Sequence, residues 1–140
     1  LSITPVVDPV VGDPVFSVQT VAQMRAMLER ATGAEGTAPL SRIQGFRVAG
    51  KTGTAHKPER GGYAKDRYIA SFAGFVPVEA PRFVIAVMVD EPTVGGYFGG
   101  EVAAPIFAEI AAASLRRMQM SPDPSIRILP DVMRVAEGAR

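Results

Sequence analysis

The residues GFRVAGKTGT, at positions 45–54, constrain the fold more than any other part of this sequence. They satisfy G-x-x-x-x-G-K-[ST], the pattern of a phosphate-binding loop, which requires a strand before its first glycine and a helix that starts at its lysine. Neither requirement is met. Residues 40–44 make a poor core strand, and the Gly and Pro residues after Lys51 disfavour a helix. The segment therefore does not indicate a nucleotide site.

The same segment contains K-T-G, at Lys51, Thr52 and Gly53, and its side chains alternate as they do in a β-strand. We expect a strand over residues 46–54. K-T-G is a signature of serine enzymes that act on penicillin and on cell-wall peptides. An ammonium group and two hydroxyls on a strand edge can hold the carboxylate of an extended peptide. K-T-G alone is also compatible with an exposed strand that carries an ordinary surface lysine.

Composition excludes several classes of protein. The 140 residues have a net charge of +1 and scattered Arg and Lys, unlike the concentrated basic face of a nucleic-acid-binding protein. Without cysteine the chain has neither disulfides nor a thiolate metal site. Its longest purely apolar run, residues 83–89, is too short to span a membrane. The first residue is Leu1 rather than Met, so we expect a fragment or a processed chain.

Hydrophobic periodicity predicts helix, strand, strand, strand, helix, over residues 17–32, 46–54, 68–76, 83–89 and 101–118. Ser17 is the expected N-cap of the first helix and Gly33 its expected end. The apolar run 83–89 predicts a buried strand, and the polar residues 55–67 a mobile loop. Short connections between strands favour antiparallel pairing. The expected fold class is therefore α+β, an antiparallel sheet flanked by helices. We expect residues 1–16 to be a lead-in loop, 17–118 the folded part and 119–140 an extended tail.

An ordered series of motifs covers most of the chain. It consists of VFSVQTVAQMRAMLE at 15–29, EGTAP at 35–39, RVAGKTGTA at 47–55, YIASFAGFVP at 68–77, FVIAVMVDEP at 83–92 and GYFGGEVAAPIFAEI at 96–110. The series resembles the C-terminal half of a class B penicillin-binding protein transpeptidase domain, most closely the division-specific (septal) D,D-transpeptidase of Gram-negative bacteria. The resemblance implies part of a penicillin-binding transpeptidase and serine β-lactamase-like fold, in which helices flank a five-stranded antiparallel sheet.

The resemblance also implies roles for the K-T-G residues. Lys51 would belong to the hydrogen-bond network around the catalytic serine. Thr52 and Thr54 would bind the carboxylate of the peptide or of a β-lactam, and Gly53 would keep the strand open to the substrate. The backbone N–H of Thr54 would contribute to the oxyanion hole, where one donor is typically worth about 3 kcal/mol.

Three aromatic residues stand where the septal enzymes line their pocket wall, namely Tyr68, Tyr97 and Phe98. The alternative for each is an aromatic side chain that packs in the core or in a loop. His56 follows K-T-G closely, where the family carries a basic residue near the pocket rim; a solvated loop histidine is the alternative.

Two further motifs of the family are absent. No serine has a lysine three residues on, as S-x-x-K requires, and without any Asn the chain cannot contain S-x-N. We therefore expect an upstream part that holds the serine nucleophile, a pedestal domain and a membrane anchor. We expect the 140-residue chain alone to be inactive, not acylated by penicillin, poorly soluble, and to expose apolar surface that the missing part would cover.

The resemblance implies peptidoglycan stem peptides and β-lactams as ligands, and no metal or organic cofactor. It implies three kinds of partner: the rest of the transpeptidase domain, a lipid-linked glycan polymerase and other division proteins. The expected location is the periplasmic side of the bacterial inner membrane. The alternatives are an elongation-type transpeptidase, a D,D-carboxypeptidase, a β-lactamase, or a non-catalytic β-lactam sensor or binding module.

Overall fold

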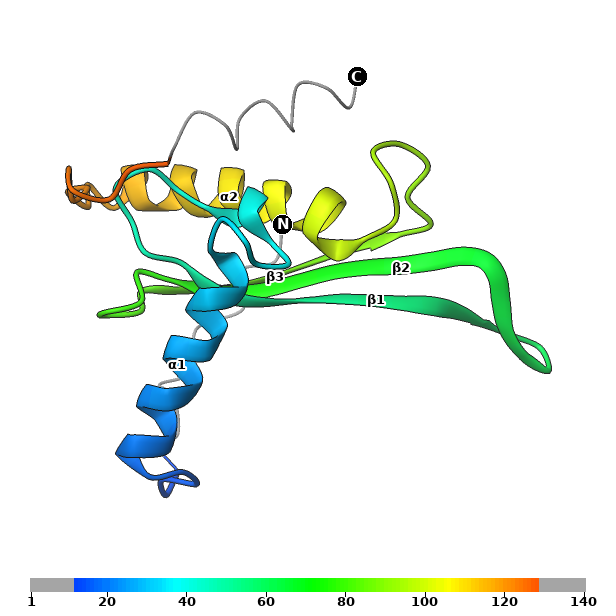
Figure 1. The fold of residues 1–140 in the computed structure, drawn as a ribbon, viewed down its shortest axis with the longest axis horizontal. Coiled ribbons are helices and arrows are strands. Elements are labelled where there is room, and N and C mark those ends of the chain that lie inside the picture. The colour runs from blue at the N-terminus through cyan, green and yellow to red at the C-terminus, as the bar shows by residue number, and fades with distance from the viewer. Residues whose placement is uncertain (1–11, 129–140) are drawn as a thin grey trace, which may run out of the picture.

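The computed structural model describes residues 12–128, which form two helices, a short 3-10 helix and one antiparallel sheet of strand order β1-β2-β3 (Figure 1). The elements are α1 (Val18–Thr32), η1 (Pro39–Ser41), β1 (Ala49–Glu59), β2 (Gly62–Val76), β3 (Phe83–Asp90) and α2 (Gly99–Arg117). The predicted α+β class, with helices flanking an antiparallel sheet, is confirmed. Residues 1–11 and 129–140 lie outside the described residues, so the predicted lead-in and tail remain predictions.

Helix α1 is capped as the sequence predicts. The Ser17 side chain accepts a hydrogen bond from the Thr20 backbone N–H at 3.1 Å, which satisfies one of the free donors at the start of a helix. Gly33 ends the helix and donates its own N–H to the Arg30 carbonyl at 3.2 Å. Local sequence signals therefore suffice to set both ends of α1.

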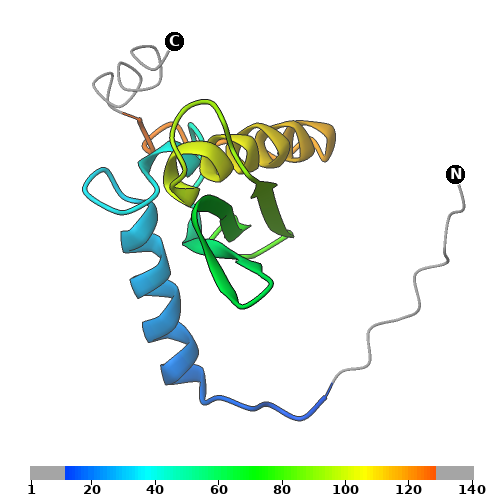
Figure 2. The ribbon, with the colours of Figure 1, turned by 90° about the vertical axis from the view of Figure 1, so that its right-hand side faces the viewer.

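The core lies between α2 and one face of the sheet. In Figure 1, α2 lies above the sheet and α1 projects below it; Figure 2 shows the same arrangement end-on. Phe72 of β2 and Phe107 of α2 are both fully buried, and their rings meet edge to face with centroids 4.8 Å apart. Burying a side chain of this size contributes about 1.5–3 kcal/mol. This contact orients α2 across β2, with its N-terminus near β1.

The expectation of a loop over residues 55–67 is wrong. β1 continues to Glu59 and β2 begins at Gly62, so the two strands form a long hairpin that extends beyond the helices (Figure 1). The added part of the hairpin is largely exposed, apart from the buried Ala64, and has no apolar alternation to reveal it. Ion pairs between strands support it instead, including Arg67 with Glu59 at 2.6 Å. Gly61, with φ of 95°, makes the tight turn.

The prediction of a buried strand at residues 83–89 is also wrong. The side chains of β3 alternate between half-buried and exposed; Val84 is 81% exposed and Met88 73%. The half-buried set faces α2, whereas no described element covers the other face at β3. The apolar run therefore belongs to a strand that has apolar side chains on both faces. Among the described residues, one of these faces is left uncovered, in line with the expected exposed apolar surface.

Apart from the hairpin, two elements begin two or more residues away from their predicted starts. β1 begins at Ala49 instead of residue 46, because the Phe46 N–H bonds back to the Ile43 carbonyl at 3.1 Å and closes a turn. α2 begins at Gly99, two residues before the predicted start. Glycine disfavours a helix in general, but tertiary contacts at Gly99 override that preference.

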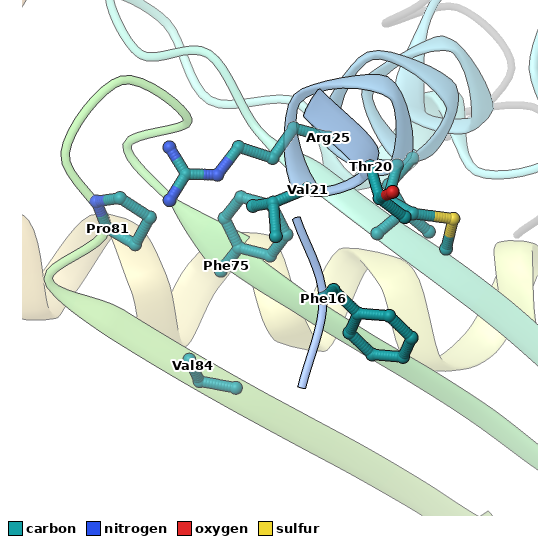
Figure 3. A pocket seen from close by; sticks show the side chains of 9 residues that line it. Phe16, Thr20, Val21, Arg25, Phe75, Pro81 and Val84 are labelled. Carbon is teal, nitrogen blue, oxygen red and sulfur yellow. The ribbon is translucent and has the colours of Figure 1, made fainter. Parts of the chain in front are cut away.

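An apolar groove runs between α1 and the sheet face opposite α2 (Figure 3). It has a volume of about 450 Å³ and is lined by Phe16, Thr20, Val21, Met24, Arg25, Leu28, Phe75, Pro81 and Val84. Arg25 is the one charged lining residue, and its Nη1 donates to the Val78 carbonyl at 3.5 Å. Phe16, at 68% exposed, lies at the margin of this groove. Within residues 12–128, no helix has the length and hydrophobicity to cross a membrane.

Candidate functional site

K-T-G lies in the middle of a strand at the edge of the sheet. Lys51 is exposed and pairs in register with Ala73 of β2, and Thr52 pairs with Phe72. No helix starts at Lys51, which excludes the phosphate-binding loop. Successive side chains of a strand point to opposite faces, so Thr52 and Thr54 share the α2 side with Phe72, whereas Lys51 and Gly53 lie on the other.

The Lys51 ammonium group nevertheless reaches the threonines. Its Nζ donates to the Thr52 carbonyl at 2.9 Å and to Thr52 Oγ1 at 3.2 Å. Because β1 is an edge strand, the flexible lysine side chain can bend around it. Thr52 Oγ1 also lies 3.4 Å from Thr37 Oγ1. The Lys51 ammonium group and the hydroxyls of Thr37 and Thr52 therefore lie close together at the edge of the sheet.

Thr54 holds the N-terminus of α2 against β1. The N-cap residue of α2, Phe98, makes no side-chain capping bond, and the Gly99 backbone N–H donates instead to Thr54 Oγ1 at 3.1 Å. A Cβ on Gly99 would lie 2.1 Å from the Ser71 carbonyl oxygen, so only glycine permits this approach. Because the hydroxyl accepts from Gly99, its own proton remains available to an anionic ligand.

These residues border a pocket of about 300 Å³, lined by Thr37, Thr52, Thr54, Phe98, Gly99, Gly100 and Glu101. The free N–H groups and the dipole at the N-terminus of α2 favour an anion. Glu101 adds a negative charge to the lining, which repels an anion. A bound carboxylate would therefore lie nearer to the threonine hydroxyls and Lys51 than to Glu101.

The three predicted aromatic residues come together with His56 in one row, here called the aromatic row. The ring centroids of His56 and Tyr68 are 4.5 Å apart. Tyr68 stacks on Tyr97 at 4.2 Å and 17°, and Tyr97 contacts Phe98 at 4.4 Å. Tyr97 and Phe98 are 39% and 50% exposed, so they do not pack in the core. His56 lies in the hairpin, not in a loop.

A charge network stands beside the aromatic row. Lys57 Nζ contacts Asp90 at 2.8 Å and Glu91 at 2.7 Å, and Arg67 contacts Glu91 at 3.3 Å. The hydrogen bonds that Lys57 donates to Asp90 and Glu91 raise the pKa of Lys57, and the bond from Lys57 lowers the pKa of Glu91. Each of these charges has a partner of opposite sign, and the network joins the hairpin to the end of β3.

Sequence reasoning did not assign Thr37, Gly99 or Gly100 to the site. Thr37 lies inside the quoted motif EGTAP, but its distance of 15 residues from Thr52 gave no reason to pair them. The pair Gly99-Gly100 just before a predicted helix was the available signal. Paired glycines in such a position indicate close approach of another backbone.

The combination of an edge strand carrying K-T-G, a hydroxyl-lined pocket and a covering helix defines a class of protein. Residues 5–112 match the family described as the penicillin binding protein transpeptidase domain, and the chain belongs to that family. The predicted resemblance to a class B penicillin-binding protein is thus confirmed.

Individual relatives agree with this assignment. The chain is 40% identical over 111 residues to the probable peptidoglycan D,D-transpeptidase PenA of Neisseria flavescens, covering 79% of this chain and 28% of that protein. It is 41% identical over 123 residues to the peptidoglycan D,D-transpeptidase FtsI of Escherichia coli K12, covering 88% of this chain and 21% of that one.

The apo transpeptidase domain of penicillin-binding protein 3 from Burkholderia pseudomallei superposes with a TM-score of 0.72 at 46% identity. That match covers 79% of this chain and 34% of the solved chain. The chain thus spans about a fifth to a third of the relatives it matches.

Proposed function

We propose that this chain is the substrate-binding, C-terminal part of a peptidoglycan D,D-transpeptidase that cross-links stem peptides during septum formation and is a target of β-lactams. The observation that carries the proposal is the pocket at the K-T-G strand, where Thr52 and Thr54 lie beside the N-terminus of α2 and the Lys51 ammonium group donates to Thr52 Oγ1. Membership of the family and the names of the relatives support the reaction class.

The K-T-G residues, Thr54 and three residues of the aromatic row have proposed roles. The hydroxyls of Thr52 and Thr54 donate to the carboxylate of the stem peptide or of a β-lactam, and Lys51 polarises the network around the nucleophile. Gly53 lets the substrate lie along the strand edge, and the Thr54 backbone N–H stabilises the oxyanion. Hydrogen bonds to a charged group contribute about 1.5–3 kcal/mol each. Tyr68, Tyr97 and Phe98 form the wall that contacts the rest of the ligand.

The bond-making step needs a serine from another part of the protein. That hydroxyl attacks the carbonyl of the penultimate D-Ala, the terminal D-Ala leaves with a proton, and an amine of a neighbouring stem then displaces the serine. None of the seven serines in this chain has the S-x-x-K context. This chain therefore contributes binding and oxyanion stabilisation, and alone it is expected to form no acyl-enzyme.

The apolar groove is the proposed contact with the rest of the transpeptidase domain. The solved relative shares only 34% of its chain with this one, so most of that domain has no counterpart here. Val84 is 81% exposed, and seven of the nine lining residues of the groove are apolar. Exposed apolar surface of this kind marks an interaction site. We propose that an apolar segment of the remaining domain packs here, with a carboxylate that faces Arg25.

The cellular setting follows from the same proposal. The complete protein would work on the periplasmic side of the bacterial inner membrane, with a lipid-linked glycan polymerase and other division proteins as partners. No metal or organic cofactor has a role in this chemistry.

Labelling with a fluorescent penicillin tests the proposal in the complete protein that contains this chain. We expect a covalent adduct, and Thr54→Ala should slow its formation about ten- to a hundredfold, the loss of one charge-assisted bond. Thr54→Ser keeps the hydroxyl and should recover most of the rate. An unlabelled wild-type protein would refute the proposal, and so would full labelling of Thr54→Ala.

A further inference from the structure

His56 connects the hairpin to the aromatic row. It stands two residues after Thr54 on the same face of β1, and it pairs in register with Tyr68 of β2. Its Nδ1 lies 2.8 Å from the Ala64 carbonyl oxygen. A carbonyl only accepts, so Nδ1 carries the proton. This bond joins the two strands and holds the imidazole ring against the Tyr68 ring, with centroids 4.5 Å apart.

The contacts that start at His56 return to the same strand. Tyr68 stacks on Tyr97, and Tyr97 contacts Phe98, the N-cap residue of α2. The next residue, Gly99, donates to Thr54 Oγ1 at 3.1 Å. The row thus starts at His56 on β1, and its other end, Phe98, precedes the residue that bonds to Thr54, two positions before His56. Phe98 also lines the pocket.

The segment that carries Tyr97 has few other restraints. Among residues 12–128, no backbone hydrogen bond joins residues 92–97 to the rest of the protein. Gly95 and Gly96 have φ of 79° and 94°, values that few other residues adopt. Ring contacts with Tyr68 and Phe98 are thus described for Tyr97, and a stacked pair such as Tyr68 and Tyr97 has a preferred geometry.

We propose that His56 is a positioning residue: it holds Tyr68, and through Tyr68 it sets where Tyr97 and Phe98 stand beside the threonine hydroxyls. The ligand touches the far end of the row, whereas His56 acts at a distance through Tyr68. This inference rests on the proposed function, because it assigns the row to the wall that receives the acyl side chain of the ligand. It predicts that His56 affects binding of the ligand more than the acylation step.

Acylation kinetics with benzylpenicillin on the complete protein test the inference. His56→Ala should lower the second-order rate constant about three- to tenfold, the equivalent of one aromatic pair. The rate at saturating penicillin should stay within about twofold of wild type. His56→Phe keeps a ring and should restore the second-order constant. The matched control is Tyr63→Ala, an aromatic of the same hairpin that is 72% exposed and outside the row. It should have no effect.

A double-mutant cycle separates positioning from a general effect on folding. His56 has no ring contact with Tyr97. In a Tyr97→Ala background, His56→Ala should nevertheless cause no further decrease in the second-order rate constant, because the row is already broken. An unchanged rate in His56→Ala, an equal loss in both backgrounds, or failure of His56→Phe to restore the rate would each overturn the inference.

A spectroscopic readout keeps this inference apart from the proposed function. Tyr68 and Tyr97 stack at 17°, so their coupling should contribute to the near-ultraviolet circular dichroism of tyrosine. His56→Ala should remove the part of the signal that Tyr97→Ala removes, and Tyr63→Ala should not. This holds even if the wild-type protein binds no penicillin. A His56→Ala spectrum identical to wild type would refute the positioning role directly.

Discussion

At the scale of single residues, the approach of α2 to β1 depends on the absence of a side chain. The Gly99 backbone lies against the carbonyls of Ser71 and Gly53, and its N–H reaches Thr54. Gly100 is equally confined, because a Cβ there would lie 2.0 Å from the Thr37 carbonyl oxygen. Two glycines therefore determine the shape of the pocket, three threonines supply its hydroxyls, and the nearby Lys51 ammonium group bonds to one of them.

Gly99→Ala should displace the start of α2, since the new methyl group meets two backbone carbonyls, at 2.1 and 2.6 Å, that cannot yield easily. We expect penicillin labelling of the complete protein to fall at least about tenfold, as when an oxyanion or carboxylate donor is misplaced. The control is Gly12→Ala, where the added Cβ has no neighbour within 4 Å. Wild-type labelling of Gly99→Ala would contradict this account.

Phe72→Ala should destabilise the protein by about 3–5 kcal/mol, because it empties a fully buried site against Phe107. Val94→Ala, at a loop residue that is 78% exposed, should change the free energy of unfolding by less than about 0.5 kcal/mol. Urea denaturation of the complete protein measures both. A loss below 1 kcal/mol for Phe72→Ala would show that the α2–sheet contact is not the core of this region.

At the scale of elements, the hairpin of β1 and β2 depends on charge rather than on apolar packing. Its outer half is largely exposed, apart from the buried Ala64. Ion pairs join Arg67 of β2 to Glu59 of β1, and Lys57 of β1 to Glu91 just after β3. Exposed ion pairs are individually weak and are screened by salt. The hairpin should therefore be among the first regions to open, even though it carries His56 and Tyr68.

The hairpin should open more readily in acid. The pKa of Glu91 is lowered below its ordinary 4.5, chiefly by the hydrogen bond from Lys57, so its contribution is present above that value and is lost as the pH falls through the folded pKa. The pKa of Lys57 is raised above 10.5, chiefly by Asp90, so its contribution fails only as the pH rises through the folded value. The ion pair between Lys57 and Glu91 should therefore contribute equally at all pH values between 4.5 and 10.5.

Hydrogen exchange of residues 55–67, corrected for intrinsic rates, measures this opening. Protection should fall below pH 4.5 in wild type, and this acid-induced loss should shrink in Glu91→Gln and in 1 M salt, where charges are screened beyond about 3 Å. Protection that is the same at pH 3 and pH 6 in wild type would contradict the electrostatic account.

At the scale of the whole molecule, the sheet is covered unequally. α2 buries one face, whereas the other face offers the apolar groove beside α1 (Figure 3). A chain that spans about a third of a solved transpeptidase domain is expected to show such a face. The site and the groove lie on different sides of the sheet, so binding of the ligand and packing of the remaining domain do not compete.

Val84→Asp should destabilise the complete protein, because it places a charge in the groove where the remaining domain is proposed to pack. We expect a loss of several kcal/mol in the free energy of unfolding, as for an unpaired buried charge. Thr93→Asp, at an exposed loop residue, is the matched control and should be nearly neutral. Equal stability of Val84→Asp and wild type would show that the groove is open to water in the complete protein.

The sequence by itself determined those features that depend on neighbouring residues or on an ordered series of motifs. Ser17 and Gly33 mark the ends of α1 through their own hydrogen bonds, and K-T-G on an alternating segment was enough to predict an edge strand and to reject a nucleotide loop. The hairpin was missed because ion pairs between strands leave no periodic pattern. The exposure of β3 was missed because an apolar run does not tell which of its faces another element covers.

Only the tertiary structure decided which distant residues share the pocket. Thr37, Thr52 and Gly99 come from a loop, a strand and a helix, and His56 reaches Phe98 only through Tyr68 and Tyr97. Such contacts depend on how α2 crosses the sheet, which the burial of Phe72 against Phe107 governs. Periodicity records which side chains avoid water along one element, and it carries no information on the position of that element relative to another.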